Sequence, residues 1–183
     1  MKLFPTEIKY HKNFINIENI NNIINYSKKY NLEKHGSLIG DAVSNHYLNK
    51  NILEEDIKNK LNKVIIEYSI ILGIKEQTLN HSWVNFQKKN SKLEKHNHGI
   101  SPISGVLYLK TDKDSSKIYF YNPNPYIYIM DIKNFNENNC GYISFNPEIG
   151  DLILFPGWLM HGSNNDINLS EERVALSFNT KDI

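Results

Sequence analysis

The period of the apolar residues changes after Gly73, and this change constrains the fold more than any other feature. From Leu53 to Leu72, apolar side chains recur at steps of three and four residues, which indicates an amphipathic helix. Gly73 stands where a glycine C-cap is expected. Beyond it the period falls to two, in short β-branched and aromatic runs bounded by Gly, Pro, Asn and Asp. This pattern predicts a sandwich or barrel of short strands.

The strand-like runs fill the second half of the chain and are HSWVNFQKK (81–89), SGVLYLK (104–110), SKIYFYN (116–122), YIYIMDI (126–132), GYISFN (141–146), GDLILF (150–155) and RVALSFN (173–179). A short strand is expected within residues 3–10. A first helix is expected to follow it, with Asn13 as N-cap and with Ile17, Ile20 and Ile24 at helical spacing. We therefore predict an α+β fold: a double-stranded β-helix (jelly-roll, cupin-like) core with two N-terminal helices packed on one sheet.

The whole chain, residues 1–183, is expected to form one domain, with 1–75 as a helical support region and 76–183 as the jelly-roll core. Residues 31–50 form a polar connection without a clear period, so His35 and His46 are expected to be surface residues without a role.

Composition excludes several classes of protein. The formal net charge is +1 and the cations are scattered, which does not indicate a nucleic-acid-binding protein. Cys140 is the only cysteine, so no internal disulfide can form and a reducing compartment is expected. The longest apolar segment, VIIEYSIILGI, contains Glu67 and is too short to span a bilayer. Abundant Ile, Asn and Lys suggest an AT-rich genome. We expect a cytoplasmic protein of a bacterium or of a phage-infected cell.

Three histidines form a candidate metal site. His96 and His98 would point to the same face if they lay on a strand, with Cα atoms about 6.5–7 Å apart. His161 follows a later strand and would complete a facial set that leaves positions open for substrate and oxidant. An HxH pair alone is more often a surface pair, and only the third histidine and a later arginine favour a metal. His81 has no such partners and is interpreted as structural.

Arg173 is the only arginine among 21 cationic residues. A chain that otherwise uses lysine throughout would keep an arginine where its planar, bidentate group is needed, and recognition of a carboxylate is the usual case. The sequence therefore predicts a carboxylate-binding site near the three histidines.

The segments WVNFQKK, KHNHGISPISGVLYLK, GDLILFPGWLMH and RVALSFN together resemble the Fe(II)/2-oxoglutarate-dependent oxygenases. The resemblance covers roughly residues 80–180. Within this superfamily the chain most resembles a group of oxygenases from marine bacteria and their phages. It is more distantly similar to the prolyl hydroxylases. It implies Fe(II) and 2-oxoglutarate as cofactors. It also implies a dioxygenase (hydroxylase) activity that releases succinate and CO2 while a small molecule or a protein side chain is oxidised.

The resemblance also implies roles for single residues. His96 matches the first iron ligand and His161 the distal one. Arg173 and Tyr108 match the pair that holds the distant carboxylate of 2-oxoglutarate, and Ser177 matches a hydroxyl that lines the pocket. Without Arg173 beside them, Tyr108 and Ser177 would be interpreted as core residues.

Further assignments follow less directly. Asn85 and Trp83, on the strand before the histidine pair, could face the cosubstrate or the substrate. The segment 123–139 is expected either to cover the substrate or to form a strand pair. A homodimer through the N-terminal helices is also possible.

One residue departs from the family pattern. Most members place an aspartate or glutamate two residues after the first histidine, and this chain has His98 there. Three neutral ligands predict weaker retention of Fe(II) and leave zinc or nickel as alternatives. A cupin-like metal-binding protein without 2-oxoglutarate chemistry, and an oxygenase fold that has become a structural protein, therefore stay open as alternatives.

Overall fold

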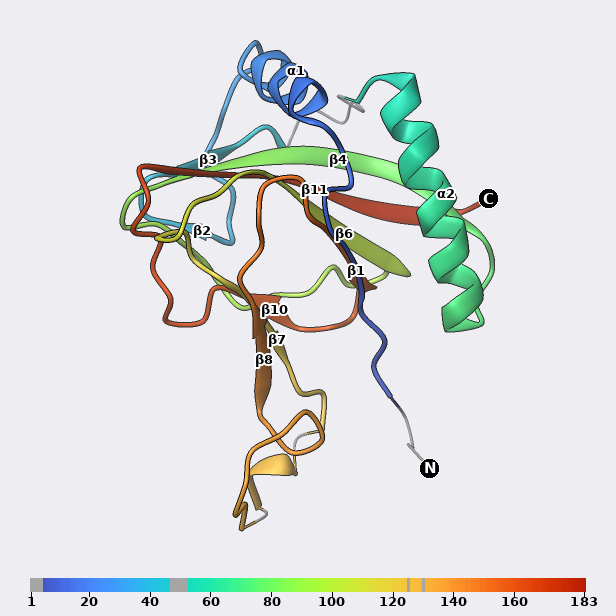
Figure 1. The fold of residues 1–183 in the computed structure, drawn as a ribbon, viewed down its shortest axis with the longest axis vertical. Helices are drawn as coiled ribbons and strands as arrows, with labels where there is room; N and C mark the ends of the chain where they lie inside the picture. Colours follow the sequence, from blue (N-terminus) through green and yellow to red (C-terminus); the bar gives the residue numbers. More distant parts are fainter. Residues whose placement is uncertain (1–4, 47–52, 125, 130) are drawn as a thin grey trace.

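The computed structural model describes residues 5–46, 53–124, 126–129 and 131–183 (Figure 1). In chain order its elements are β1 (Lys9–His11), α1 (Ile17–Ser27), β2 (Leu38–Ile39), β3 (Ala42–Ser44), α2 (Glu55–Leu72), β4 (Gln77–Lys88), β5 (Lys92–Leu93), β6 (Ile103–Lys110), β7 (Ile118–Tyr121), the 3-10 helix η2 (Ile127–Ile129), β8 (Tyr142–Phe145), β9 (Leu152–Pro156), β10 (His161–Gly162) and β11 (Glu172–Asp182).

Two antiparallel sheets form the β core. The larger has the strand order β1-β9-β6-β11-β4-β3, and the smaller has the order β10-β7-β8. β2 and β5 form a separate two-stranded ladder. Both helices lie on the outer side of the large sheet, while β7 and β8 extend from the opposite side of the molecule (Figure 1). The predicted α+β jelly-roll with two helices on one sheet is confirmed.

The central strands of the large sheet separate two clusters of buried side chains. Because successive residues on a strand point to opposite faces, β6, β9 and β11 each contribute to both clusters. The cluster toward the helices includes Val84, Phe86, Leu107, Leu109, Val174, Leu176 and Phe178. The cluster toward the small sheet includes Val106, Tyr108, Ile153, Phe155 and Ala175. The second face of the sheet carries the pocket described below.

The two helices differ in how well their ends were predicted. α2 ends as expected at Gly73, whose φ of 66° is the left-handed conformation that glycine adopts most easily. The N-cap of α1 is Asn16, whose side chain accepts a hydrogen bond from the backbone N–H of Asn19, so the prediction of Asn13 is wrong. Asn13 instead takes a left-handed turn with φ 50°.

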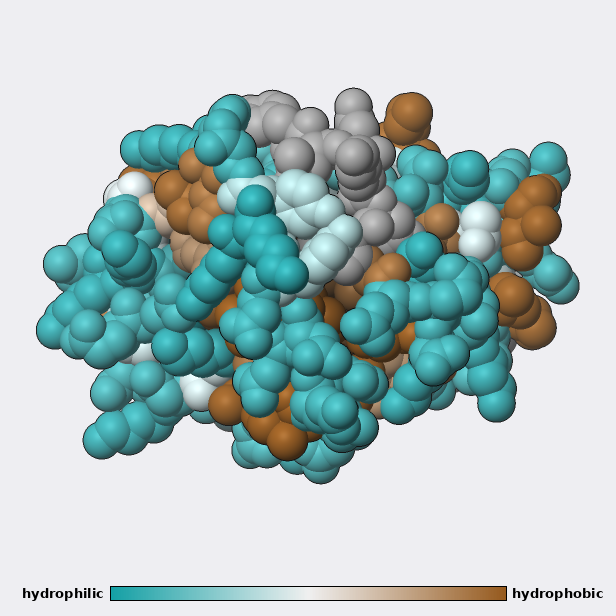
Figure 2. Space-filling view, turned by 90° about the horizontal axis from the view of Figure 1, so that it is seen from above, coloured by the Kyte–Doolittle hydropathy of each residue, from teal (hydrophilic) through white to brown (hydrophobic). Residues whose placement is uncertain are grey.

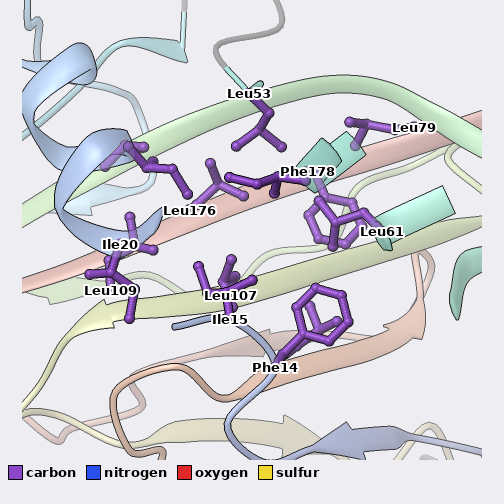
Figure 3. Close-up of a cluster of buried hydrophobic side chains, with 14 of the residues drawn as sticks. Phe14, Ile15, Ile20, Leu53, Leu61, Leu79, Leu107, Leu109, Leu176 and Phe178 are labelled. Carbon is purple, nitrogen blue, oxygen red and sulfur yellow. The ribbon is translucent and has the colours of Figure 1, made fainter. Parts of the chain in front are cut away.

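Apolar side chains from both helices fill the space above the sheet. Ile20 of α1 and Leu61 of α2 meet Leu107 and Leu176 of the sheet in one cluster (Figure 3). Seen from above, the outer surface on this side is largely hydrophilic with separate hydrophobic spots (Figure 2). Each helix thus buries one face only, as its period predicts.

We expect Leu61→Ala to lower the free energy of unfolding by about 2–5 kcal/mol, because Leu61 is fully buried and its removal leaves a cavity between α2 and the sheet. Chemical denaturation measures this change. The matched control is Ile70→Ala on the same helix, where the side chain is 68% exposed and about 0.5 kcal/mol or less is expected. Equal losses in the two variants would contradict the described packing of α2.

Two segments differ from what the sequence pattern suggested. YIYIMDI was predicted to be a strand, but its residues 127–129 form η2, and none of its described residues lies in a strand. The strand on which His96 and His98 would have shared one face is also absent; this segment is a loop joined to β10 by one isolated bridge, His96↔His161. Among the described residues, no helix is long and apolar enough to cross a membrane.

Candidate metal centre and cosubstrate pocket

Backbone contacts bring the loop of residues 94–101 against the start of β10. His96 and His161 exchange two backbone hydrogen bonds of 2.9 Å, and the N–H of His98 donates to the carbonyl of Gly157 at 2.9 Å. A Cβ atom on Gly157 would lie 2.0 Å from the carbonyl oxygen of Ser101, so only glycine allows this approach. The two histidine segments are therefore held together by their backbones.

The side chains of His96, His98 and His161 converge from these segments, and one nitrogen of each lies within 4.8 Å of the others. Nδ1 of His96 lies 2.8 Å from the carbonyl of Glu94, and Nδ1 of His161 lies 2.9 Å from the carbonyl of Leu159. Since a carbonyl only accepts, both Nδ1 atoms must carry the proton. Each Nε2 is then left with a free lone pair, the arrangement found in metal-binding histidines.

Burial keeps these imidazoles neutral. It lowers the pKa of His98 to about 3, with smaller contributions from His96, His46 and His35. Burial also lowers the pKa of His96, and it lowers that of His161 further. Nε2 of His98 lies 3.2 Å from Nε2 of His161, so a shared proton or a cation must relieve the repulsion of their lone pairs. Among the described residues, no aspartate or glutamate joins the group.

Arg173 lies in the same pocket as the three histidines. It is only 4% exposed, and no carboxylate lies within ion-pair distance among the described residues. Its Nη1 donates to Oε1 of Gln87, its guanidinium lies 5.0 Å from the centre of the Tyr108 ring, and its Nε has no partner. A buried, unpaired cation is strongly unfavourable. This environment therefore favours binding of an anion.

The strand register explains why these side chains share one face. Arg173 of β11 pairs with Gln87 of β4, and the next positions on the same face pair Ala175 with both Asn85 of β4 and Tyr108 of β6. Asn85 donates through Nδ2 to Oγ of Ser177 at 3.2 Å. Tyr108, Arg173, Ser177 and Asn85 thus all line a pocket of about 240 Å³ that also contains the three histidines.

Tyr108 is fully buried, and its hydroxyl has no hydrogen-bond partner. Burial raises the pKa of Tyr108 to about 12, against the opposing effect of the Arg173 guanidinium. The phenol is therefore neutral at pH 7 and can donate its proton to an anion beside Arg173.

A second group of aromatic rings lines the pocket beside the three histidines. The ring of Trp83 lies 5.9 Å from that of His98 and 4.5 Å from that of His46, and the His35 ring lies 4.1 Å from His46. His35 and His46 are half-buried pocket residues, so their expected surface position is wrong. Their segment is brought here by the β2–β5 and β3–β4 pairings, which its aperiodic sequence does not reveal. Nε2 of His81 donates to the backbone carbonyl of His46 at 3.2 Å.

His46 is one of the histidines that make stability depend on pH. Burial lowers the pKa of His46 to about 4, with smaller effects of His35 and His81. In the unfolded chain the pKa of this histidine is about 6.5. Its contribution to the free energy of unfolding is therefore complete above that pH and is lost as the pH falls toward about 4.

We therefore expect His46→Gln to reduce the slope of unfolding free energy against pH between these limits, measured by denaturant titration of metal-free protein. Lys63→Gln, at an exposed lysine of α2, is the control. A slope that His46→Gln leaves unchanged would contradict the expectation.

Gln87 was missed as a pocket residue in the sequence. The alternation of residues did indicate that Trp83, Asn85 and Gln87 share one face of a strand, opposite to Val84 and Phe86. The strand register that places Gln87 opposite Arg173 could not be predicted from the sequence.

Comparison with known proteins supports the same class. Residues 81–179 match a family model described as "Putative 2OG-Fe(II) oxygenase". None of the curated proteins matches this sequence. The expectation of a marine bacterial or phage source stays a prediction.

Solved structures share the fold at low identity. A Pseudomonas putida prolyl-4-hydroxylase is 11% identical with a TM-score of 0.66, over 97% of this chain and 94% of that chain. HygX from Streptomyces hygroscopicus, solved with nickel, 2-oxoglutarate and hygromycin B, is 11% identical with a TM-score of 0.66, over 97% and 83%. A Trichoplax adhaerens prolyl hydroxylase in complex with a hypoxia inducible factor peptide is 12% identical with a TM-score of 0.69, over 96% and 83%.

The family match covers more than half of the chain, and it includes the three histidines, Tyr108 and Arg173. The alternative of a cupin-like protein without 2-oxoglutarate chemistry is not favoured. The chain belongs to the Fe(II)- and 2-oxoglutarate-dependent oxygenases.

Proposed function

We propose that His96, His98 and His161 hold Fe(II), and that Arg173 and Tyr108 hold the distal carboxylate of 2-oxoglutarate, in an enzyme that hydroxylates a small molecule or a protein side chain. The observation that carries the proposal is the buried Arg173, which has no carboxylate partner among the described residues and shares one pocket with the histidine cluster. An anion-binding group and a metal-binding group in one pocket fit a ligand with a carboxylate at one end and a chelating group at the other.

The chemistry of the donor set fits both cofactors. Two of the three imidazoles have Nδ1 committed to a backbone carbonyl, so their Nε2 lone pairs are available to a metal. The unpartnered donors of Tyr108 and Arg173 fit a carboxylate. When bound, Fe(II) supplies the oxygen chemistry of the family: one atom of O2 goes to succinate as CO2 is released, and the other to the substrate C–H bond.

The residues of this chain position the reactants. Arg173 neutralises the distal carboxylate, and the Tyr108 hydroxyl donates to it, which directs the keto-acid end of 2-oxoglutarate toward the histidines. Phe155 and Val106 line the pocket and limit the access of water. A dry pocket strengthens the ion pair with Arg173, because its dielectric constant is low.

The substrate is expected to enter beside Trp83, His46 and His35. Along β4 the pocket face runs from Gln87 through Asn85 to Trp83, and the last lies beside His98. The end of the pocket at Gln87 is the proposed position of the cosubstrate, which leaves the end at Trp83 for the substrate. HygX binds hygromycin B and the Trichoplax enzyme a peptide, so either class of substrate is compatible with this fold.

The test is anaerobic titration of the protein with Fe(II) and 2-oxoglutarate. We expect saturable binding of 2-oxoglutarate and a visible metal-to-ligand charge-transfer band, followed by release of succinate when O2 is admitted. Pre-treatment with a chelator should abolish the band, and added Fe(II) should restore it. Tight zinc binding without any affinity for 2-oxoglutarate would overturn the proposal.

A further inference from the structure

Gln87 lies at the carboxylate end of the pocket, and neither its backbone nor its side chain faces solvent. It is 1% exposed, and its backbone carbonyl accepts a hydrogen bond of 3.1 Å from Nδ2 of the buried Asn168. Its neighbour across the strands is Arg173. A buried amide in this position needs partners for both its oxygen and its nitrogen.

The contact with Arg173 fixes which way the amide of Gln87 is turned. A guanidinium has only donors, so the group of Gln87 that faces Nη1 of Arg173 must be the oxygen Oε1. The NH2 group is then directed away from Arg173, and the structure gives its Nε2 no hydrogen-bond partner. A buried amide nitrogen without a partner costs stability unless a ligand supplies an acceptor.

Three donors on residues that line the pocket thus have no partner: Nε2 of Gln87, Oη of Tyr108 and Nε of Arg173. One carboxylate has two oxygens with about four acceptor sites, so a single carboxylate can satisfy all three. No acidic side chain among the described residues does so, because Arg173 has no carboxylate partner there.

We propose that Gln87 is a cosubstrate-selecting residue: its Oε1 orients Arg173, and its Nε2 donates to the distal carboxylate of a five-carbon 2-oxo dicarboxylate. This inference rests on the proposed function of the pocket and adds a residue to it. Gln87 contributes in two ways, as a direct donor and through the orientation of the guanidinium. Its loss therefore reduces discrimination for the distal carboxylate, while the keto-acid end is recognised as before.

The experiment compares two ligands that differ only at that end. 2-Oxovalerate has a methyl group where 2-oxoglutarate has the distal carboxylate. Dissociation constants of both are measured by anaerobic calorimetry with Ni²⁺ as the metal, so the readout does not depend on turnover. For Gln87→Met we expect the Kd of 2-oxoglutarate to rise by about 10-fold or more, as for the loss of a hydrogen bond to a charged group. The Kd of 2-oxovalerate should stay within about 2-fold, because the hydrogen bond is absent from that complex.

A second variant gives effects of opposite sign on stability and binding. Gln87→Glu places a carboxylate against Arg173, which pairs the buried cation and repels the ligand. We expect an unchanged or higher melting temperature for the protein without ligand, together with a loss of 2-oxoglutarate affinity of about 100-fold or more. A residue with only a structural role would not raise stability and abolish binding in one substitution.

Gln77→Met is the matched control, because Gln77 is also a buried glutamine of β4, but it bonds Lys75 and Asp182 outside the pocket. We expect it to lower the melting temperature and to leave both dissociation constants unchanged. Equal weakening of 2-oxoglutarate and 2-oxovalerate by Gln87→Met would overturn the inference. Failure of the unmodified protein to bind 2-oxoglutarate at all would instead overturn the proposed function, so the two failures are distinguishable.

Discussion

We expect Arg173→Met to abolish measurable selection for 2-oxoglutarate over 2-oxovalerate and to raise the Kd of 2-oxoglutarate by about 100-fold or more. The expected size follows from the removal of one partner of a buried charge pair, which typically costs about 3–5 kcal/mol. Arg173 is 4% exposed, so solvent does not screen this interaction. Anaerobic calorimetry with Ni²⁺ measures both constants.

The stability of the same variant provides an independent test. Arg173 without ligand is a buried cation with no carboxylate partner among the described residues. Its replacement by an apolar side chain of similar length should leave the melting temperature unchanged or raise it. Saturating 2-oxoglutarate should raise the melting temperature of the unmodified protein but not that of Arg173→Met.

Two further variants separate charge from geometry. Arg173→Lys keeps the charge but loses the planar group that bonds Gln87 and lies beside the Tyr108 ring, so we expect an intermediate loss of about 10-fold. Lys110→Met, on the neighbouring strand β6, removes a partly exposed cation that pairs with Glu172 and should change neither constant. An Arg173→Lys protein indistinguishable from the unmodified one would contradict the carboxylate assignment.

The fold was predictable because its main signals are local. The period of two after Gly73 predicted most of the strands, and the left-handed Gly73 ends α2 where the sequence placed its C-cap. The wrong strand prediction for residues 126–132 also results from relying on a local pattern. Alternation of Tyr and Ile satisfies the pattern of a strand, but a strand also needs a neighbour to bond, and η2 has none among the described strands.

The site was only partly predictable, because several of its residues depend on long-range pairing. The HxH motif, a later histidine and the only arginine could be recognised from residue type and order. Gln87 can be recognised as a site residue only from its pairing with Arg173, and no local sequence pattern predicts that pairing. His35 reaches the pocket through a segment without a period, so nothing in its neighbourhood in the sequence distinguished it from a surface histidine.

His161→Ala should lower the affinity for Ni²⁺ or Fe(II) by at least about 100-fold, because it removes one of three ligands and leaves a pair. The substitution lies at a side chain that is 3% exposed, so the melting temperature should be measured alongside. Metal affinity is measured by anaerobic calorimetry. His11→Gln, at a histidine of β1 outside the pocket, is the control and should leave metal binding unchanged.

His98→Ala decides how the site departs from the family pattern. If His98 is the third ligand, His98→Ala should lower the metal affinity as much as His161→Ala does, since both Nε2 atoms then face the same ion. If His98 only packs against Trp83 and His161, the loss should stay within about 10-fold, as for residues that support a ligand. The 3.2 Å separation of the two Nε2 atoms allows both to face one ion, and a proton shared between them fits it equally well, so the affinity of the variant separates the two arrangements.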